Sequence, residues 1–222
     1  MKDIISRIAL AIGGIFFIGI LFSKEFRVAM GLLIDQLMFP FSGIPFHITI
    51  FILSIFTATY TNLIQKYTVD FEKIKHAQEV IREYQKEYME AVKQNNKFKL
   101  KQLEKRSDEI KQLQSEVMSM QFKPMFYAGI VTIPIFAWLW EKAVASYELL
   151  YGAIKGYGNI TGELPASYIS SINPELFKVV APFTGQIHVA ATILVFPWWL
   201  WWYILCSMTV GQIIKKILKV GV

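Results

Sequence analysis

The sequence has few of the residues on which catalytic and metal sites depend. It contains one cysteine, Cys206, and three scattered histidines, His47, His76 and His188. A single cysteine excludes a disulfide framework and a cysteine-based zinc site. There is also no H-E-x-x-H motif, no glycine-rich phosphate loop and no nucleophile elbow. We therefore expect no catalytic residues, no metal site and no cofactor, and interpret the chain as a protein that is not an enzyme.

Charged residues are scarce outside one block of the chain. Of the 222 residues, 54% are apolar and 15% aromatic, whereas residues 66–123 hold 13 Lys and Arg and 10 Asp and Glu. This separation excludes an ordinary soluble domain and indicates an integral membrane protein. The net charge is +6, but the interleaved acids in the charged block argue against specific DNA binding. A ribosomal surface and anionic lipid remain compatible partners.

Residues 66–123 contain neither glycine nor proline, which favours uninterrupted helix. Two series of mostly apolar residues recur there at alternating spacings of 3 and 4, the pattern of a coiled-coil seam. The series are Ile74, Ala77, Ile81, Tyr84, Tyr88 and Ala91, then Leu103, Arg106, Ile110, Leu113, Val117 and Met120. The polar segment 94–97 between them predicts a turn. We therefore predict an antiparallel coiled-coil hairpin, with a solvated spacer as the alternative.

The apolar segments on either side predict an all-α membrane protein with three core transmembrane helices. We expect these spans at 47–65, 124–142 and 187–208, with kinks at Pro134 and Pro197. The middle span has only 17 apolar residues, about 25 Å of helix against a hydrocarbon core of about 30 Å. Residues 143–186 contain Gly152, Gly162 and Pro165 and predict a loop with short helical pieces.

Two further segments precede the first core span. Residues 1–23 predict a hydrophobic anchor, or alternatively a helix at the membrane surface. Residues 24–46 predict an interfacial amphipathic helix followed by a turn at Pro40, Gly43 and Pro45. Lysines are rare in the 143–186 loop but frequent in the hairpin and in the basic tail at 209–222. By the positive-inside rule the hairpin and tail are cytoplasmic and the loop is extracytoplasmic.

One face of the 47–65 span is polar. Ser54, Thr57, Thr61 and Gln65 recur at spacings of 3, 4 and 4, so they share a helical face. Because polar atoms facing lipid are costly, this stripe should face protein or water. The alternative is that the hydroxyls bond to their own helix or to a neighbouring one.

This order of segments resembles the YidC/Oxa/Alb membrane protein insertases. The likeness is closest to the archaeal YidC-like branch, which is related to the third subunit of the endoplasmic reticulum membrane protein complex. Its most specific local motif is Thr132-Ile-Pro-Ile-Phe-Ala-Trp-Leu-Trp140, similar to the Gln-Met-Pro-Ile-Phe motif of bacterial insertases. Those insertases have five core spans, and many place an arginine on the span before the hairpin, which 47–65 lacks.

The resemblance implies an insertase or chaperone of the cell membrane, working without ATP through a polar groove open to cytoplasm and lipid. The implied clients are nascent membrane proteins, with the ribosome and small partner subunits as further candidates. The expected groove residues are Ser54, Thr57, Thr61, Gln65, Thr132, His188 and Thr192. Met118, Met120 and Met125 are the expected capture surface, because methionine packs against many apolar shapes. A membrane-anchored coiled-coil tether and a small transporter or channel subunit are the alternatives.

Overall fold

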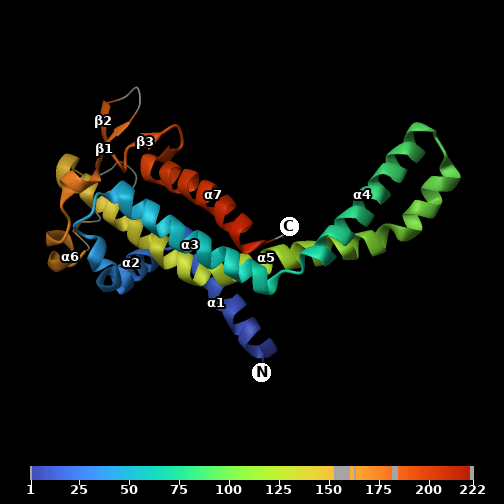
Figure 1. Cartoon of the computed structure of the whole chain (residues 1–222), viewed down its shortest axis with the longest axis horizontal. Coiled ribbons are helices and arrows are strands. Elements are labelled where there is room, and N and C mark those ends of the chain that lie inside the picture. Colours follow the sequence, from blue (N-terminus) through green and yellow to red (C-terminus); the bar gives the residue numbers. More distant parts are fainter. Residues whose placement is uncertain (1, 153–160, 163, 182–184, 221–222) are drawn as a thin grey trace.

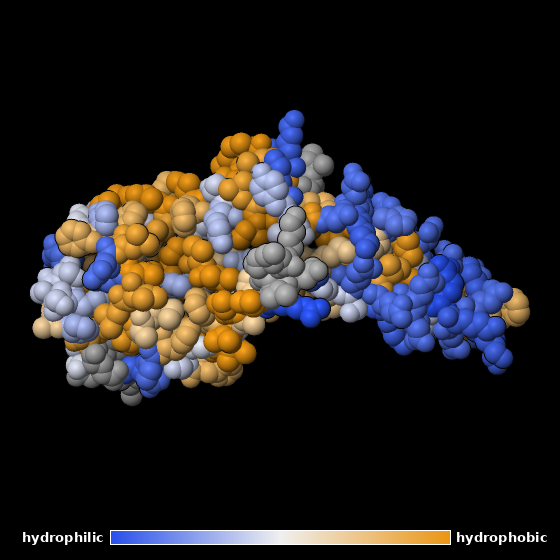
Figure 2. Space-filling view, turned by 90° about the horizontal axis from the view of Figure 1, so that it is seen from below, coloured by the Kyte–Doolittle hydropathy of each residue, from blue (hydrophilic) through white to orange (hydrophobic). Residues whose placement is uncertain are grey.

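The chain forms an apolar helical body from which a long hydrophilic arm projects (Figures 1 and 2). The computed structural model describes residues 2–152, 161–162, 164–181 and 185–220. Parts of the predicted 143–186 loop and the last two residues of the predicted tail therefore lie outside the described residues. Figure 2 shows mostly apolar surface over the body and mostly hydrophilic surface over the arm.

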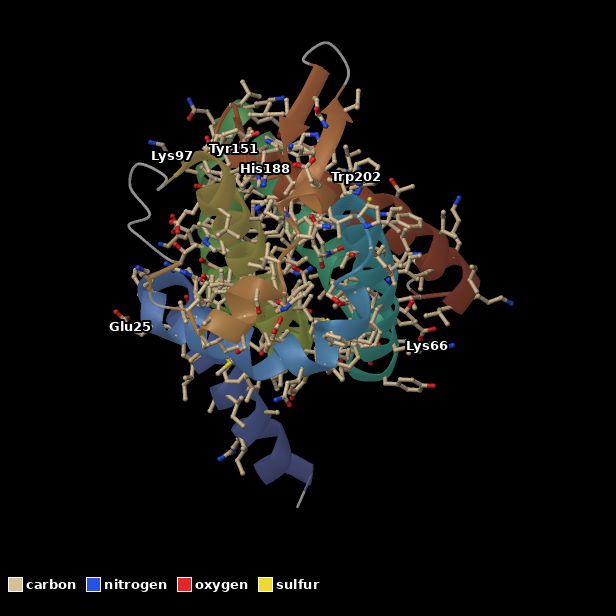
Figure 3. The ribbon with its side chains drawn as sticks, turned by 90° about the vertical axis from the view of Figure 1, so that its left-hand side faces the viewer. Glu25, Lys66, Lys97, Tyr151, His188 and Trp202 are labelled. Atoms are coloured by element: carbon tan, nitrogen blue, oxygen red, sulfur yellow. The ribbon has the colours of Figure 1, made fainter. Side chains whose placement is uncertain are left out.

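Three helices form the centre of the body: α3 (Phe46–Thr68), α5 (Lys97–Tyr151) and α7 (Trp198–Leu218). α3 packs against both α5 and α7, as the view along the body shows (Figure 3). The indole of Trp202 donates a hydrogen bond of 2.9 Å to the carbonyl of His47, which fixes the beginning of α7 to the beginning of α3.

Two helices at the amino-terminal end pack on α5. These are α1 (Lys2–Phe22) and α2 (Lys24–Met38), which a short 3-10 helix, η1 (Phe39–Phe41), follows. The pair bends by 115° at the break, where the Ser23 hydroxyl accepts the Phe26 N–H at 3.0 Å. α1 approaches α5 closely at Gly13, where a Cβ would lie 2.3 Å from the Phe126 carbonyl oxygen. Only glycine fits this contact.

The arm consists of α4 (Phe71–Lys93) and the first half of α5, joined by a three-residue turn. Asn95 has a φ of 52°, a left-handed conformation that asparagine tolerates. The Asn96 side chain caps α5 by accepting the Lys99 N–H at 3.0 Å. The buried residues between the two helices are Ile74, Ala77, Ala91, Leu103, Ile110 and Val117, all on the predicted seam, whereas Tyr88 and Arg106 are exposed.

Helix α5 corrects two of the predicted boundaries. We predicted a span beginning at Pro124 and a loop beginning at residue 143, but one helix runs from Lys97 to Tyr151 with Pro124 and Pro134 inside it. The helix continues past Lys142 because Ala143 and Ala145 are fully buried in the body core. The middle span is therefore not unusually short, because the helix does not end at the charged pair Glu141 and Lys142.

The segment before α7 also differs from the prediction, which placed a helix over 187–208. Residues 187–197 form strand and turn instead, and α7 begins at Trp198. Pro197 has extended backbone at the position that caps α7. Because proline has no N–H to donate and disfavours helix in the residue before it, a helix begins more readily after Pro197 than before it. It therefore precedes the helix and does not kink it.

Short elements fill the described parts of the region between α5 and α7. They are α6 (Ala166–Ser170), the 3-10 helix η2 (Pro174–Phe177) and strands β1 (Lys178–Ala181), β2 (Gly185–His188), β3 (Thr192–Ile193) and β4 (Phe196–Pro197). β1 pairs with β2 and β3 with β4, both antiparallel. The predicted short helical pieces are present, whereas the strand pairs were not predicted.

By length and composition, two of the described helices can cross a membrane: α3 and α5. A third crossing is available if the bent α1–α2 pair forms one broken span. α7 is not in this set. The protein is a mostly helical integral membrane protein with two or three such helices.

Candidate functional site

The polar stripe on α3 faces protein. Ser54 is fully buried and donates a hydrogen bond of 2.7 Å to the Phe51 carbonyl. Thr57 is equally buried and donates to the Leu53 carbonyl at 2.9 Å. Both hydroxyls are satisfied by their own helix, as small hydroxyls commonly are in membrane helices. For these two residues the structure therefore shows the helix-bonding alternative.

Beside Thr57 the stripe opens into a small cavity between α3 and α7. Its volume is about 170 Å³, and we call it the polar pocket. Its lining residues are Thr57, Ala58, Thr61, Asn62, Tyr203, Ser207 and Gly211. The Thr57 and Tyr203 hydroxyl oxygens lie 3.0 Å apart at its wall. Thr61 is half-buried and is one of the lining residues.

The polar pocket can hold water or the polar backbone of another chain. Its hydroxyl groups both donate and accept hydrogen bonds, and no carboxylate or amine is among its lining residues. The Asn62 amide donates to the Ala58 carbonyl at 2.8 Å, which leaves its carbonyl oxygen as an acceptor. The pocket is therefore a neutral, polar site inside an apolar helical body.

Gln65, the last stripe residue, lies outside the polar pocket. It lines a larger cavity of about 620 Å³ where α3, α4 and α5 meet, together with Phe71, Ile74 and Pro124. We call this cavity the junction pocket. It lies where the arm joins the body, one helical turn beyond Thr61 on α3. The predicted stripe thus serves two neighbouring cavities and not a single groove.

Two of the three predicted capture methionines are exposed. Met118 is 55% exposed and Met125 is 43% exposed. Phe122, 46% exposed, lies between them at spacings of 4 and 3, so the three side chains share one face of α5. Met120 is half-buried and packs inside the arm against the cluster of Ile74 and Val117. It is therefore a packing residue of the arm and not part of the exposed surface.

The other predicted groove residues lie elsewhere. The Thr132 hydroxyl donates to the Ala128 carbonyl of its own helix at 2.9 Å. His188 is buried on β2, with Nε2 3.1 Å from the Ser146 hydroxyl near the end of α5 (Figure 3). Thr192 is exposed on β3. The last two were grouped with the stripe because a helix was predicted over 187–208, where the chain instead forms strands.

Sequence reasoning missed the α7 side of the polar pocket. Tyr203, Ser207 and Gly211 recur every four residues and so form one face of α7. This spacing is a signal that could have been found. It was hidden by the cluster of Trp198, Trp199, Trp201 and Trp202, which dominates this part of the sequence.

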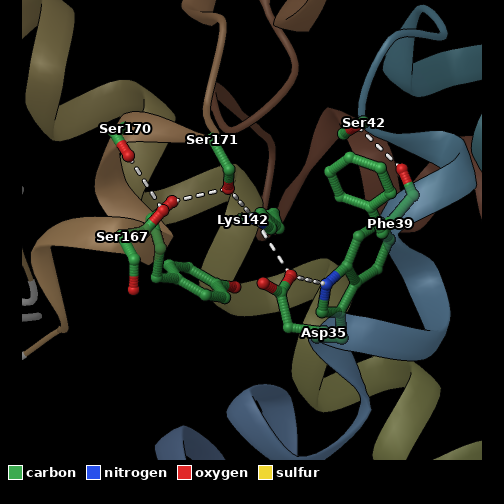
Figure 4. A network of polar contacts seen from close by, with 9 residues as sticks. Asp35, Phe39, Ser42, Lys142, Ser167, Ser170 and Ser171 are labelled. Atoms are coloured by element: carbon green, nitrogen blue, oxygen red, sulfur yellow. Dashed lines mark hydrogen bonds and ion pairs between the residues drawn. The ribbon is translucent and has the colours of Figure 1, made fainter.

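A buried polar network near the far end of α5 was also missed. Lys142 Nζ lies 3.0 Å from a carboxylate oxygen of Asp35 on α2 and donates to the Ser171 hydroxyl at 2.8 Å (Figure 4). The Trp138 indole donates to the same Asp35 oxygen at 2.7 Å. The Lys142 ammonium also lies 3.8 Å from the centre of the Tyr168 ring. These contacts tie α2 and the residues after α6 to α5.

A family profile described as "Integral membrane protein EMC3/TMCO1-like" matches residues 31–222. The match therefore covers α3, the arm, α5 and α7, and begins within α2. No curated protein and no solved structure matches the chain.

Proposed function

Because the chain belongs to the EMC3/TMCO1-like family of the YidC/Oxa1/Alb3 insertase superfamily, we propose that it helps apolar segments of newly made proteins enter the bilayer. The family is linked to membrane protein insertion. The observation that carries the proposal for this chain is the polar pocket between α3 and α7, in a body whose face in Figure 2 is mostly apolar.

The polar pocket lowers the barrier that the hydrophilic end of a client must cross. Water or client backbone held by the hydroxyls of Thr61, Tyr203 and Ser207 replaces part of the apolar path through the bilayer. An apolar client segment then gains about −0.3 to −0.6 kcal/mol per Leu, Ile, Phe or Val. About fifteen such residues give roughly −5 to −9 kcal/mol, enough to offset one or two translocated charges at about +2.5 to +3.5 kcal/mol each. Partition of the client itself drives insertion, so ATP is not needed.

The exposed face of Met118, Phe122 and Met125 is the first contact for the client. It lies on α5 where the arm meets the body, next to the junction pocket that Pro124 lines. Flexible methionines accept apolar segments of different shapes. In this mechanism the arm and the end of α7 face the cytoplasm, α7 is the third core span, and the client moves from the methionine face to the polar pocket.

The test is the insertion of a model client by variants of one stripe threonine. Thr61→Leu removes a hydroxyl from the polar pocket, and Thr59→Leu is the matched control because the Thr59 hydroxyl bonds to the Ile55 carbonyl and does not line the pocket. A membrane hydrogen bond contributes about 0.6 kcal/mol, so we expect Thr61→Leu to slow insertion about threefold. Thr57 is a poor choice, since leucine at this fully buried site would overpack.

Equal insertion by the wild type and both variants would remove the polar pocket from the mechanism. Equal loss in Thr61→Leu and Thr59→Leu would assign the effect to helix packing. The protein is reconstituted in vesicles for this assay, and circular dichroism checks that each variant is folded.

A second function is favoured by the tip of the arm. Met89, Val92 and Phe98 lie at the turn between α4 and α5 and are exposed, Phe98 by 73%. Exposed apolar residues at the end of a charged arm are typical of a surface that binds another protein. This supports a tether that holds a partner subunit or a ribosome at the membrane. Capture of one stoichiometric partner, lost in Phe98→Ser, with normal insertion in Thr61→Leu, would favour the tether over the insertase.

A further inference from the structure

A third cavity lies between α1, α2, α5 and α7 and shares no lining residue with the polar pocket. Its volume is about 480 Å³. Its lining residues are aromatic or aliphatic except for Arg27, the one charged residue among them. The aromatic ones are Phe17, Phe136, Trp140 and Trp199. We call it the Arg27 pocket.

The guanidinium of Arg27 is only partly satisfied by protein. Its Nη1 donates to the Ile20 carbonyl at 2.9 Å, whereas Nε is buried and has no hydrogen-bond partner among the described residues. No carboxylate lines the cavity within the described part of the chain. The neighbouring Glu25 is exposed and accepts a hydrogen bond from the Ser23 hydroxyl. Arginine has five N–H donors and a permanent positive charge, so the guanidinium can still bind a phosphate beside its bond to Ile20.

The size of the cavity discriminates between an acyl chain and a protein helix. A helix about 10 Å wide would fill 480 Å³ within about 6 Å of its length, roughly one turn. A single acyl chain is much narrower than a helix, so the cavity can hold a longer stretch of it against the aromatic residues. The lining is apolar apart from Arg27. A protein segment in the cavity would therefore find no other charged partner for its polar groups.

We propose that the Arg27 pocket binds one acyl chain of an anionic phospholipid, with the lipid phosphate on the Arg27 guanidinium. Trp140 and Trp199 pack against the chain, and the second acyl chain remains in the bilayer. Because Phe17 and Ile20 belong to α1 and Arg27 to α2, the lipid holds the bent α1–α2 pair against α5 and α7. This ligand site is separate from the proposed client path, since it uses a different cavity.

The test is photolabelling of the full-length protein in phosphatidylcholine nanodiscs that contain a minor lipid with a diazirine near the end of one acyl chain. Three probes carry the same chain: phosphatidylglycerol, phosphatidylcholine and uncharged diacylglycerol. Mass spectrometry then maps the labelled peptides. We expect phosphatidylglycerol to label peptides that contain Phe136, Trp140 and Trp199 more strongly than phosphatidylcholine does, and diacylglycerol to label them least.

Arg27→Gln should reduce this labelling about tenfold, since a charge-assisted contact is lost. Arg82→Gln, on the exposed face of α4, is the matched control and should change nothing. Leu200→Trp fills the cavity while Arg27 remains, and should also remove the label. Circular dichroism and size-exclusion chromatography check that each variant is folded. If either Arg27→Gln or Leu200→Trp unfolds, the labelling of the other variant tests the proposal.

Equal labelling by phosphatidylglycerol and diacylglycerol, or full labelling of folded Arg27→Gln, would overturn the proposal and assign the label to bulk lipid. A synthetic transmembrane peptide with one aspartate can be added as a competitor. If it abolishes labelling by the lipid probe, the occupant is a protein segment, and the proposal is also overturned. The labelling needs no client and no insertion assay, so its failure is distinct from failure of the proposed insertase function.

Discussion

Thr57 and Tyr203 show how a residue pattern can predict a surface but not its use. The spacing of Ser54, Thr57 and Thr61 predicted a polar face on α3, and that face is directed at protein. Periodicity within one helix gives no information about which helix lies opposite. The position of Tyr203, with its hydroxyl 3.0 Å from Thr57, depends on the packing of α7 on α3, which is a long-range contact.

His188 gives a prediction at the residue scale. Burial, helped by the positive charge of Lys178, lowers the pKa of His188 to about 4. Its Nδ1 accepts the Ala190 N–H at 3.1 Å, so the proton of the neutral ring is on Nε2, which donates to the Ser146 hydroxyl. Protonation at Nδ1 would place two N–H groups against each other. The folded protein therefore requires the neutral ring.

The consequence is a loss of stability in acid. An unfolded histidine binds a proton near pH 6.5, whereas the folded one does so only near pH 4. Between these values the unfolded state binds more protons, so the free energy of unfolding falls by up to about 1.4 kcal/mol per pH unit as pH is lowered. The measurement is the melting temperature from pH 7 to pH 4.5, compared with His188→Gln. The His188→Gln variant should be less stable at pH 7, and its melting temperature should fall less as the pH is lowered. Melting temperatures that fall equally with pH in both proteins would contradict a low pKa for His188.

At the scale of elements, prolines were the least reliable signals. Pro124 was expected to begin a helix but lies inside α5, whereas Pro134 lies inside α5 as expected. The local cost of a missing N–H is outweighed there by burial of the residues that follow, such as Ile135 and Leu139. Pro197, by contrast, precedes α7. Local sequence does not show which outcome applies, because burial depends on the other helices.

The network of Asp35, Lys142 and Trp138 joins α2 to α5. Asp35→Asn keeps an acceptor for the Trp138 indole but leaves the buried Lys142 ammonium without its anion. We expect a loss of about 3 kcal/mol, because an uncompensated charge remains inside the protein. Adding Lys142→Met removes that charge and should recover most of the loss. Thermal unfolding followed by tryptophan fluorescence measures both, and additive losses in the double variant would contradict this account.

The arm shows what local sequence does determine. Asn95 and Asn96 form its turn, and the buried residues of α4 and α5 fall on the predicted 3–4 spacing. Both features depend on near neighbours or on a pattern repeated along one helix pair. The strands at 187–197 depend instead on pairing, of β2 with β1 and of β3 with β4. The apolar residues of this segment were interpreted as helix, so the pairing was not predicted.

At the scale of the whole molecule, the distribution of positive charge predicts the orientation in the membrane. The arm and the end of α7 should face the cytoplasm and β2 the opposite side. In a Cys206→Ser background, a membrane-impermeant maleimide added outside intact cells should label Gln186→Cys and not Asn95→Cys. Both positions are exposed, so accessibility to the reagent depends on sidedness alone. Labelling of Asn95→Cys from outside would invert the proposed topology.

In the proposed mechanism, a client passes from the methionine face of α5 to the polar pocket. The most direct measurement is photocrosslinking from a benzophenone amino acid at Met118, at Thr61 or at the control position Thr59, to a ribosome-bound nascent membrane protein of increasing length. We predict crosslinks from position 118 at shorter lengths and from position 61 at longer ones, with few from position 59. Equal crosslinking from positions 61 and 59 at every length, or none from position 61 in the folded protein, would contradict the account.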